Sequence, residues 1–157
     1  MTTPPGSSRS LLSVALLVAV SLSLSTPAAE AARNAPPSST ELRARVLVLV
    51  NRSRMVNGFH ALRLNPRLSR EALAHSREMA RSGDISHTAD LATLIHRLGG
   101  TVFGEDVARG RGLRGICDAW LHREDTRTVL LDNQFRIVGL GVVHVDGFYW
   151  VTLQAFD

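Results

Sequence analysis

Apolar side chains recur every three to four residues over most of the chain up to about residue 122, a spacing typical of amphipathic helices. The first helix is expected to begin at a capping box, because Ser38 is followed three residues later by Glu41. The second has Asn65 as its N-cap and Pro66 in its first turn, and Gly83 ends it. The pattern predicts four helices, over residues 38–57, 65–83, 88–98 and 113–122.

The C-terminal part of the chain is rich in Val, Phe, Tyr and Trp, which favour strands. Two apolar runs, Ile137–His144 and Phe148–Phe156, flank Asp146-Gly147, a sequence typical of a two-residue hairpin turn. A hairpin alone is only marginally stable, so a third strand is needed, and residues 101–108 are the available segment. Helices followed by an antiparallel sheet that they can cover predict an α+β sandwich.

Residues 1–31 have the pattern of a cleaved secretion signal. Arg9 provides the positive charge of the n-region, residues 11–24 are free of charge, and Ala29-Glu30-Ala31 offers the small-x-small motif of a cleavage site. A transmembrane anchor is the alternative, but a spanning helix needs about 20 predominantly apolar residues, and serines interrupt this run. We therefore expect a secreted protein without a stable membrane anchor, with a linker over residues 32–40 and one domain over residues 41–157.

The charged residues indicate no nucleic-acid partner. All 18 basic residues are arginines, they are interspersed with acids, and there is only one Tyr. The single cysteine, Cys117, has no partner for an internal disulfide, so the core has to hold by packing alone. Its place on an apolar helix face predicts a buried side chain. His75 lies in the apolar stripe of the second helix, and we expect a packed, hydrogen-bonded core histidine.

Six short motifs follow one another along the chain. They are Leu49-Val50-Asn51-x-x-Arg54, Leu62-x-Leu64-Asn65, Ala74-His75-Ser76-x-x-Met79, Ser86-His87-Thr88, Gly104-Glu105-Asp106 and Gly139-x-Gly141. In this order they closely resemble bacterial CAP domains, the superfamily of cysteine-rich secretory proteins, antigen five and pathogenesis-related proteins, in which the fifth motif reads Gly-Glu-Asn. The resemblance covers about residues 41–157. It implies an α-β-α sandwich, with about four helices packed on a three-stranded antiparallel sheet.

The resemblance also implies a cleft in which two His and two acids meet, a ligand set that suits Zn²⁺ or a similar divalent cation. By position, His87 matches the first His, Glu105 the first acid and Asp118 the second acid, shortened by one methylene. Thr126 stands where the second His belongs, so the set is degenerate. His122 follows Asp118 by four residues on one helix face and is a weaker candidate ligand. A surface position at a helix end, where its charge suits the helix dipole, is the expected alternative.

Two functional hypotheses follow from this cleft. The incomplete ligand set favours a non-catalytic extracellular binding module, a monomer whose ligand is a lipid, a cell-wall component or a host or competitor molecule. Such a module requires no cofactor and binds a divalent cation weakly. The alternative is a metal-dependent extracellular hydrolase or protease that uses the same cleft, with Glu105 as general base.

Overall fold

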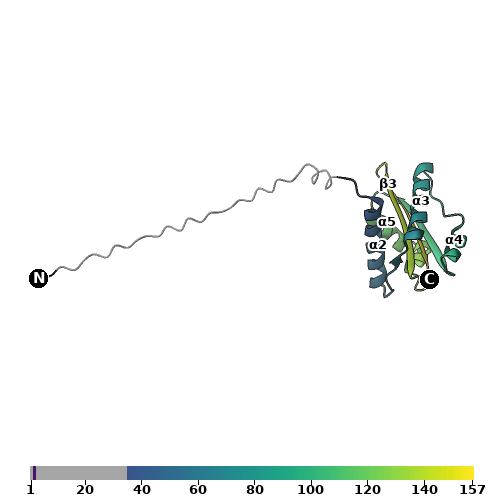
Figure 1. Cartoon of the computed structure of the whole chain (residues 1–157), viewed down its shortest axis with the longest axis horizontal. Helices are drawn as coiled ribbons and strands as arrows, with labels where there is room; N and C mark the ends of the chain where they lie inside the picture. Colours follow the sequence, from purple (N-terminus) through teal and green to yellow (C-terminus); the bar gives the residue numbers. More distant parts are fainter. Residues whose placement is uncertain (1, 3–34) are drawn as a thin grey trace. The chain divides into compact units, whose positions relative to one another are not determined.

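The computed structural model describes residue 2 and residues 35–157, so the predicted secretion signal lies, apart from residue 2, outside the described residues. The elements along the chain are α2 (Ser39–Val56), β1 (Arg63–Leu64), α3 (Pro66–Ser82), α4 (Leu91–Arg97), β2 (Phe103–Gly110), α5 (Leu113–His122), α6 (Glu124–Leu131), β3 (Ile137–Val145) and β4 (Phe148–Phe156). Figure 1 colours them by their position in the sequence and labels α2, α3, α4, α5 and β3. Within this described part, no helix combines the length and the apolar character needed to cross a membrane.

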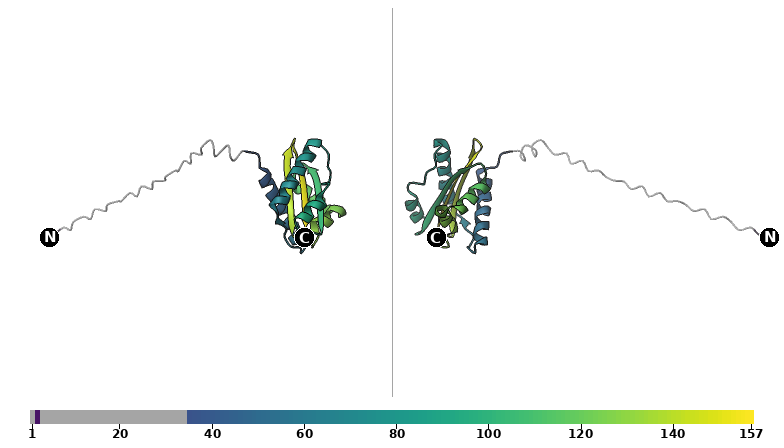
Figure 2. Two further views of the ribbon diagram at one scale, coloured as in Figure 1. Left: turned by 45° about the vertical axis from the view of Figure 1, so that its right-hand side comes forward. Right: turned by 180° about the vertical axis from the view of Figure 1, so that it is seen from behind.

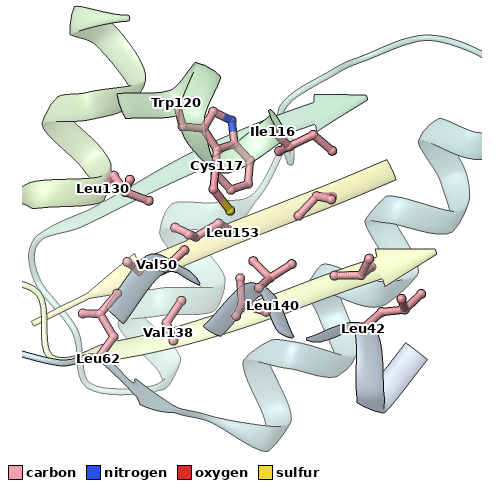
Figure 3. Packing of buried hydrophobic residues seen from close by; sticks show 14 of the residues in the cluster. Leu42, Val50, Leu62, Ile116, Cys117, Trp120, Leu130, Val138, Leu140 and Leu153 are labelled. Carbon is pink, nitrogen blue, oxygen red and sulfur yellow. The ribbon is translucent and has the colours of Figure 1, made fainter. Parts of the chain in front are cut away.

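A four-stranded sheet in the order β1-β3-β4-β2 lies between two layers of helices (Figure 2). The strands β2, β4 and β3 are antiparallel neighbours, and β1 runs parallel to β3. On one face, α2, α5 and α6 bury a core that includes Val50, Trp120 and Leu153 (Figure 3). On the other face, Leu68 and Ile95 of α3 and α4 pack against the end of β4. The α+β class and the α-β-α sandwich are therefore confirmed.

Glycines on β3 allow α3 to lie close to the sheet. Alternate residues of β3, such as Val138 and Leu140, belong to the core under α2 and α5, so the residues between them face α3. A Cβ at Gly139 would overlap the Leu68 side chain, and a Cβ at Gly141 would overlap the backbone of Ala72. Only glycine leaves room there for the α3 backbone.

Most element boundaries follow the predicted local signals. Ser38 and Glu41 form the capping box of α2, the Asn65 side chain accepts hydrogen bonds at the start of α3, and Gly83 ends that helix with φ 80°. The Asn65 cap accepts hydrogen bonds from backbone N–H groups of the first turn of α3 that otherwise have no partner. The predicted hairpin turn joins β3 to β4.

The structure differs from the sequence-based expectation in four elements. The described residues contain a fifth helix, α6, and a fourth strand, β1, so the sheet is mixed and not purely antiparallel. The third helix begins at Leu91 and not at Thr88, because the Thr88 backbone and hydroxyl bond to Glu105. Strand β2 begins at Phe103, because Thr101 is held by the Asp157 carboxylate.

Candidate functional site

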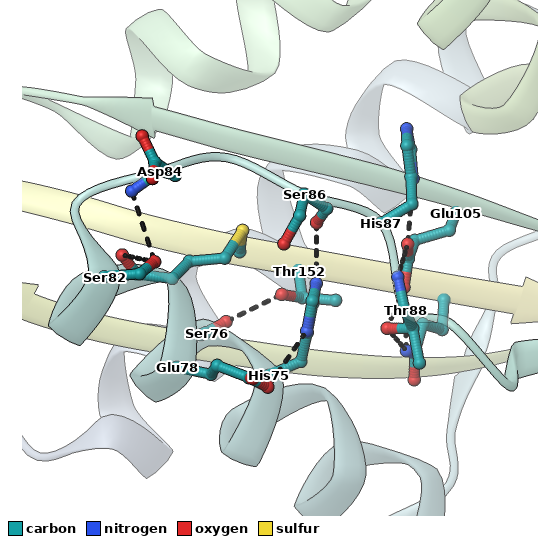
Figure 4. A network of polar contacts seen from close by, with 12 residues as sticks. His75, Ser76, Glu78, Ser82, Asp84, Ser86, His87, Thr88, Glu105 and Thr152 are labelled. Atoms are coloured by element: carbon teal, nitrogen blue, oxygen red, sulfur yellow. Dashed lines mark hydrogen bonds and ion pairs between the residues drawn. The ribbon is translucent and has the colours of Figure 1, made fainter.

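The carboxylate of Glu105, on β2, is the centre of a polar network that ties the loop before α4 to the sheet (Figure 4). Its Oε1 accepts hydrogen bonds from His87 Nδ1 and the Thr88 backbone N–H, both at 2.8 Å. Its Oε2 accepts from Thr88 Oγ1 at 2.6 Å and from Gln154 Nε2 at 2.8 Å. Each oxygen therefore has two donors, and only 4% of the Glu105 side chain is exposed.

These hydrogen bonds keep Glu105 ionised. Burial by itself would raise the pKa of Glu105, but the hydrogen bonds from Thr88, Gln154 and His87 outweigh it and lower the pKa below its ordinary value. A carboxylate accepts only, so His87 must carry a proton on Nδ1, and in the neutral ring Nε2 keeps a free lone pair. The His87 side chain is 68% exposed, and Nε2 is the nitrogen that a ligand can reach.

A second histidine holds the other side of the same loop. His75 Nε2 lies 2.7 Å from the carbonyl oxygen of Ser86, and His75 is 9% exposed, so the predicted hydrogen-bonded core histidine is confirmed. Next to it on α3, Ser76 Oγ donates to Thr152 Oγ1 at 2.9 Å. The loop lines an open groove of about 950 Å³ along α3. Its charged rim includes Arg67, Glu71, Glu78, Asp90 and Arg97.

The other sequence-predicted site residues lie in the opposite layer of helices. Asp118 is on α5 and lines a hollow beside α2, and its carbonyl oxygen lies 2.6 Å from His122 Nδ1 in the same helix. Thr126 is on α6, and its hydroxyl donates to the Trp120 carbonyl oxygen at 2.8 Å. Glu105, in contrast, points with Gln154 toward the α3 layer. The structure brings His87 and Glu105 together, but not Asp118, His122 or Thr126 with them.

The residues around Glu105 do not fit the divalent cation site that the resemblance implies. Nowhere in the described part of the chain do three His, Cys, Asp or Glu residues meet in a way that could hold a metal ion. His87 offers one free nitrogen, while both oxygens of Glu105 are already occupied by hydrogen-bond donors. A zinc site normally takes three or four protein ligands.

Asp106 is a buried titratable group that sequence reasoning missed. It follows Glu105 on β2 and therefore points to the opposite face of the sheet, where it is 2% exposed. Among the described residues, its Oδ2 has no hydrogen-bond partner. Burial, and then the charges of Asp125 and Glu105, raise the pKa of Asp106 to about 8. The sequence signal that could have indicated this group is Asp106 itself, which stands where the family signature has Asn.

An apolar groove lies on the α2 side of the molecule, between α2 and α5, with a volume of about 550 Å³. We call it the α2–α5 groove, and its lining residues are Ala44, Arg45, Val48, Leu49, Arg111, Gly112, Leu113 and Tyr149. Val48 is 66% exposed there. A smaller hollow of about 220 Å³ lies next to it and shares Leu49. Cys117 borders this hollow but is 2% exposed, which confirms its predicted burial, and burial raises the pKa of its thiol to about 12.

Comparison with known proteins gives one family match. The family model described as CAP, the Cysteine-rich secretory protein family, matches residues 47–155. Fifteen chains of solved structures also match, whereas no protein of curated function does.

Three bacterial proteins are among the matching structures. An outer surface protein from Borrelia burgdorferi is 16% identical, with a TM-score of 0.67 over 77% of this chain and 96% of that one. An extracellular protein containing a SCP domain from Bacillus anthracis is 26% identical, with a TM-score of 0.57 over 79% of this chain and 45% of that one. A cysteine-rich secretory protein from Staphylococcus aureus is 19% identical, with a TM-score of 0.62 over 79% of this chain and 42% of that one. The chain thus spans less than half the length of the last two.

Proposed function

Since the chain belongs to the cysteine-rich secretory protein (CAP) family, we propose that it is a secreted, non-catalytic module that binds a lipid-like anion in the α2–α5 groove. The observation that carries this proposal is the apolar lining of that groove. Val48 stands exposed within it, and Leu49 and Leu113 pack partly buried beside it. Each methylene group of a ligand that is buried there would contribute about 0.8 kcal/mol.

Two arginines at the groove suit the polar end of such a ligand. Among the described residues, neither Arg45 nor Arg111 forms a salt bridge. Arg111 does lie over the ring of Phe148, with its Cζ 4.6 Å from the ring centroid. A carboxylate or phosphate beside an apolar chain would gain charge-assisted hydrogen bonds from these guanidinium groups.

The bonding of Glu105 supports a non-catalytic role. A general base needs a lone pair aimed at the proton that it removes. The four donors around Glu105 occupy both of its oxygens and hold Thr88 and His87 in place. This carboxylate therefore fastens a loop to the sheet, and it is poorly placed to activate a water molecule.

Binding of a fluorescent fatty-acid analogue tests the proposal. Val48→Asp should weaken binding at least about tenfold, because a carboxylate in the groove is costly to desolvate and repels the anionic head. Ile85→Asp is the matched control, since Ile85 is also an exposed apolar residue, at 53%, but lies outside the groove. Equal binding by Val48→Asp and the wild type would refute the proposed site.

A metal-dependent hydrolase is the second candidate function, and one observation favours it. The Glu105 carboxylate orients the imidazole of His87 and leaves Nε2 open to the groove along α3, an arrangement common to metal-binding and catalytic histidines. Metal content after exhaustive dialysis separates the two candidates. Stoichiometric metal that His87→Ala removes would support the hydrolase, whereas a metal-free protein that still binds the fatty-acid analogue would support the binding module.

A further inference from the structure

The outer face of α2 carries an unusual combination of exposed apolar and cationic side chains. Val48, Met55 and Val56 are 66%, 60% and 80% exposed, and they are half of the six exposed large apolar residues in the described part of the chain. Arg45 and Arg52 lie on the same helix at spacings of three and four residues from Val48, so all five share one face. This face is opposite the buried stripe of α2, and no described element covers it.

A sixth residue extends this face onto the neighbouring helix. Arg114 of α5 lines the small hollow beside α2 together with Arg52 and Val56. The salt bridges found among the described residues include none with Arg45, Arg52 or Arg114, so these charges are available to a partner. Two acids lie near these charges. The pKa of Glu41 is lowered by hydrogen bonds from Ser38 and, to a smaller extent, by the charge of Arg45, and Asp118 lies at the rim of the hollow.

We propose that the α2 face, formed by Arg45, Val48, Arg52, Met55, Val56 and Arg114, docks on the surface of an anionic phospholipid bilayer. Arginines beside exposed apolar side chains suit the interface of an anionic membrane, because their charged ends stay among the phosphates while their apolar stems lie deeper. The apolar side chains enter the boundary of the acyl region, and the guanidinium groups contact phosphates. The inference rests on the proposed function in one respect, because docking would place the α2–α5 groove against the bilayer, the source of the lipid-like ligand.

Charge argues for a bilayer over a second copy of the chain. In a twofold dimer through this face, the arginines of one copy would lie against the same arginines of the other, and like charges in contact oppose association. An anionic bilayer provides the opposite charge over the whole face. Each arginine close to such a surface strengthens binding about fivefold, and the effect falls as salt increases.

Vesicle co-sedimentation of the secreted protein tests the docking. Vesicles of equal parts phosphatidylglycerol and phosphatidylcholine should bind the protein, and vesicles of pure phosphatidylcholine should bind it at least about tenfold more weakly. Arg52→Glu combined with Arg114→Glu should weaken binding to the anionic vesicles at least about 25-fold, because two favourable charges are lost. The control is Arg77→Glu combined with Arg81→Glu on α3, which changes the net charge equally on exposed residues of the other layer and should change binding less than about threefold.

Three results would overturn the docking. The first is an equal loss of vesicle binding in the Arg52/Arg114 and Arg77/Arg81 double variants. The second is equal binding of the wild type to charged and neutral vesicles. The third is self-association of the protein through Val56 without any vesicle binding. Arg52 and Arg114 lie outside the α2–α5 groove, so binding of the soluble fatty-acid analogue should persist in their double variant. Analogue binding without vesicle binding refutes the docking alone, and vesicle binding without analogue binding refutes only the proposed function.

Discussion

Replacing Asp106 by Asn should stabilise the protein at neutral and alkaline pH. The wild-type carboxyl group is 2% exposed, and one of its oxygens has no donor among the residues that the structure describes. Burial, with the charges of Asp125 and Glu105, raises its pKa to about 8, whereas an Asp in an unfolded chain has a pKa of about 3.9. Asn has nearly the same shape and carries no charge.

The size of the effect depends on pH. Between about pH 4 and pH 8, the folded state binds more protons at Asp106 than the unfolded state does, so the stability of the wild type falls as the pH rises. At pH 7, about three pH units above the unfolded pKa, the cost is at most roughly 4 kcal/mol, because one pKa unit corresponds to about 1.4 kcal/mol. Local relaxation reduces this limit, and we expect a stabilisation of about 2–4 kcal/mol at pH 7.

Urea unfolding of the wild type and Asp106→Asn at several pH values between 4 and 9 measures this difference. The two curves of stability against pH should nearly meet at pH 4, separate steadily, and run parallel above about pH 8. Asp84→Asn is the control, because Asp84 is exposed, and its effect should stay within about 0.5 kcal/mol. A gap between wild type and Asp106→Asn that is the same at pH 4 and pH 8 would show that Asp106 does not titrate with a raised pKa.

Two further substitutions test the packing of α3 and the Glu105 network. Gly141→Ala should cost at least about 3 kcal/mol in a denaturant melt, because its Cβ meets the α3 backbone. The control is Gly115→Ala on α5, which has open space around it and should be neutral or stabilising by up to about 1 kcal/mol. Similar losses at both positions would contradict the close approach of α3. Thr88→Ala removes a 2.6 Å hydrogen bond to Glu105 and should cost about 1.5–3 kcal/mol at pH 7. The cost should decrease as the pH is lowered and Glu105 becomes protonated, because the pKa of this group is lowered in the folded state. A loss at pH 7 no larger than that of exposed Thr93→Ala would mean that the network is weak.

The local signals of the chain were sufficient for most of its elements. The capping box of Ser38 and Glu41 and the hairpin turn at Asp146-Gly147 were predicted because each depends on residues at most three positions apart. In the turn, Asp146 and Gly147 have φ of 50° and 75°, the left-handed conformation that an Asp-Gly pair tolerates. Strand β1 was missed because two residues carry no alternation, and its partner in β3 lies more than 70 residues away. Helix α6 was missed because Leu130 is its one fully buried side chain, and a single apolar contact gives no helical periodicity in the sequence.

The sequence alone determined the class of the fold, the family and the pairing of two candidate residues. His87 and Glu105 both match family motifs, and the structure places His87 Nδ1 2.8 Å from Glu105 Oε1. Tertiary structure decided which layer each further residue occupies: Asp118 matched by position, yet α5 packs on the face opposite to Glu105. Neighbours on a strand point to opposite faces, so Glu105 reaches the Thr88 loop while Asp106 is buried beneath the other helices. Caps and turns depend on nearby backbone, whereas a site depends on the packing of distant segments, and only the folded chain determines it.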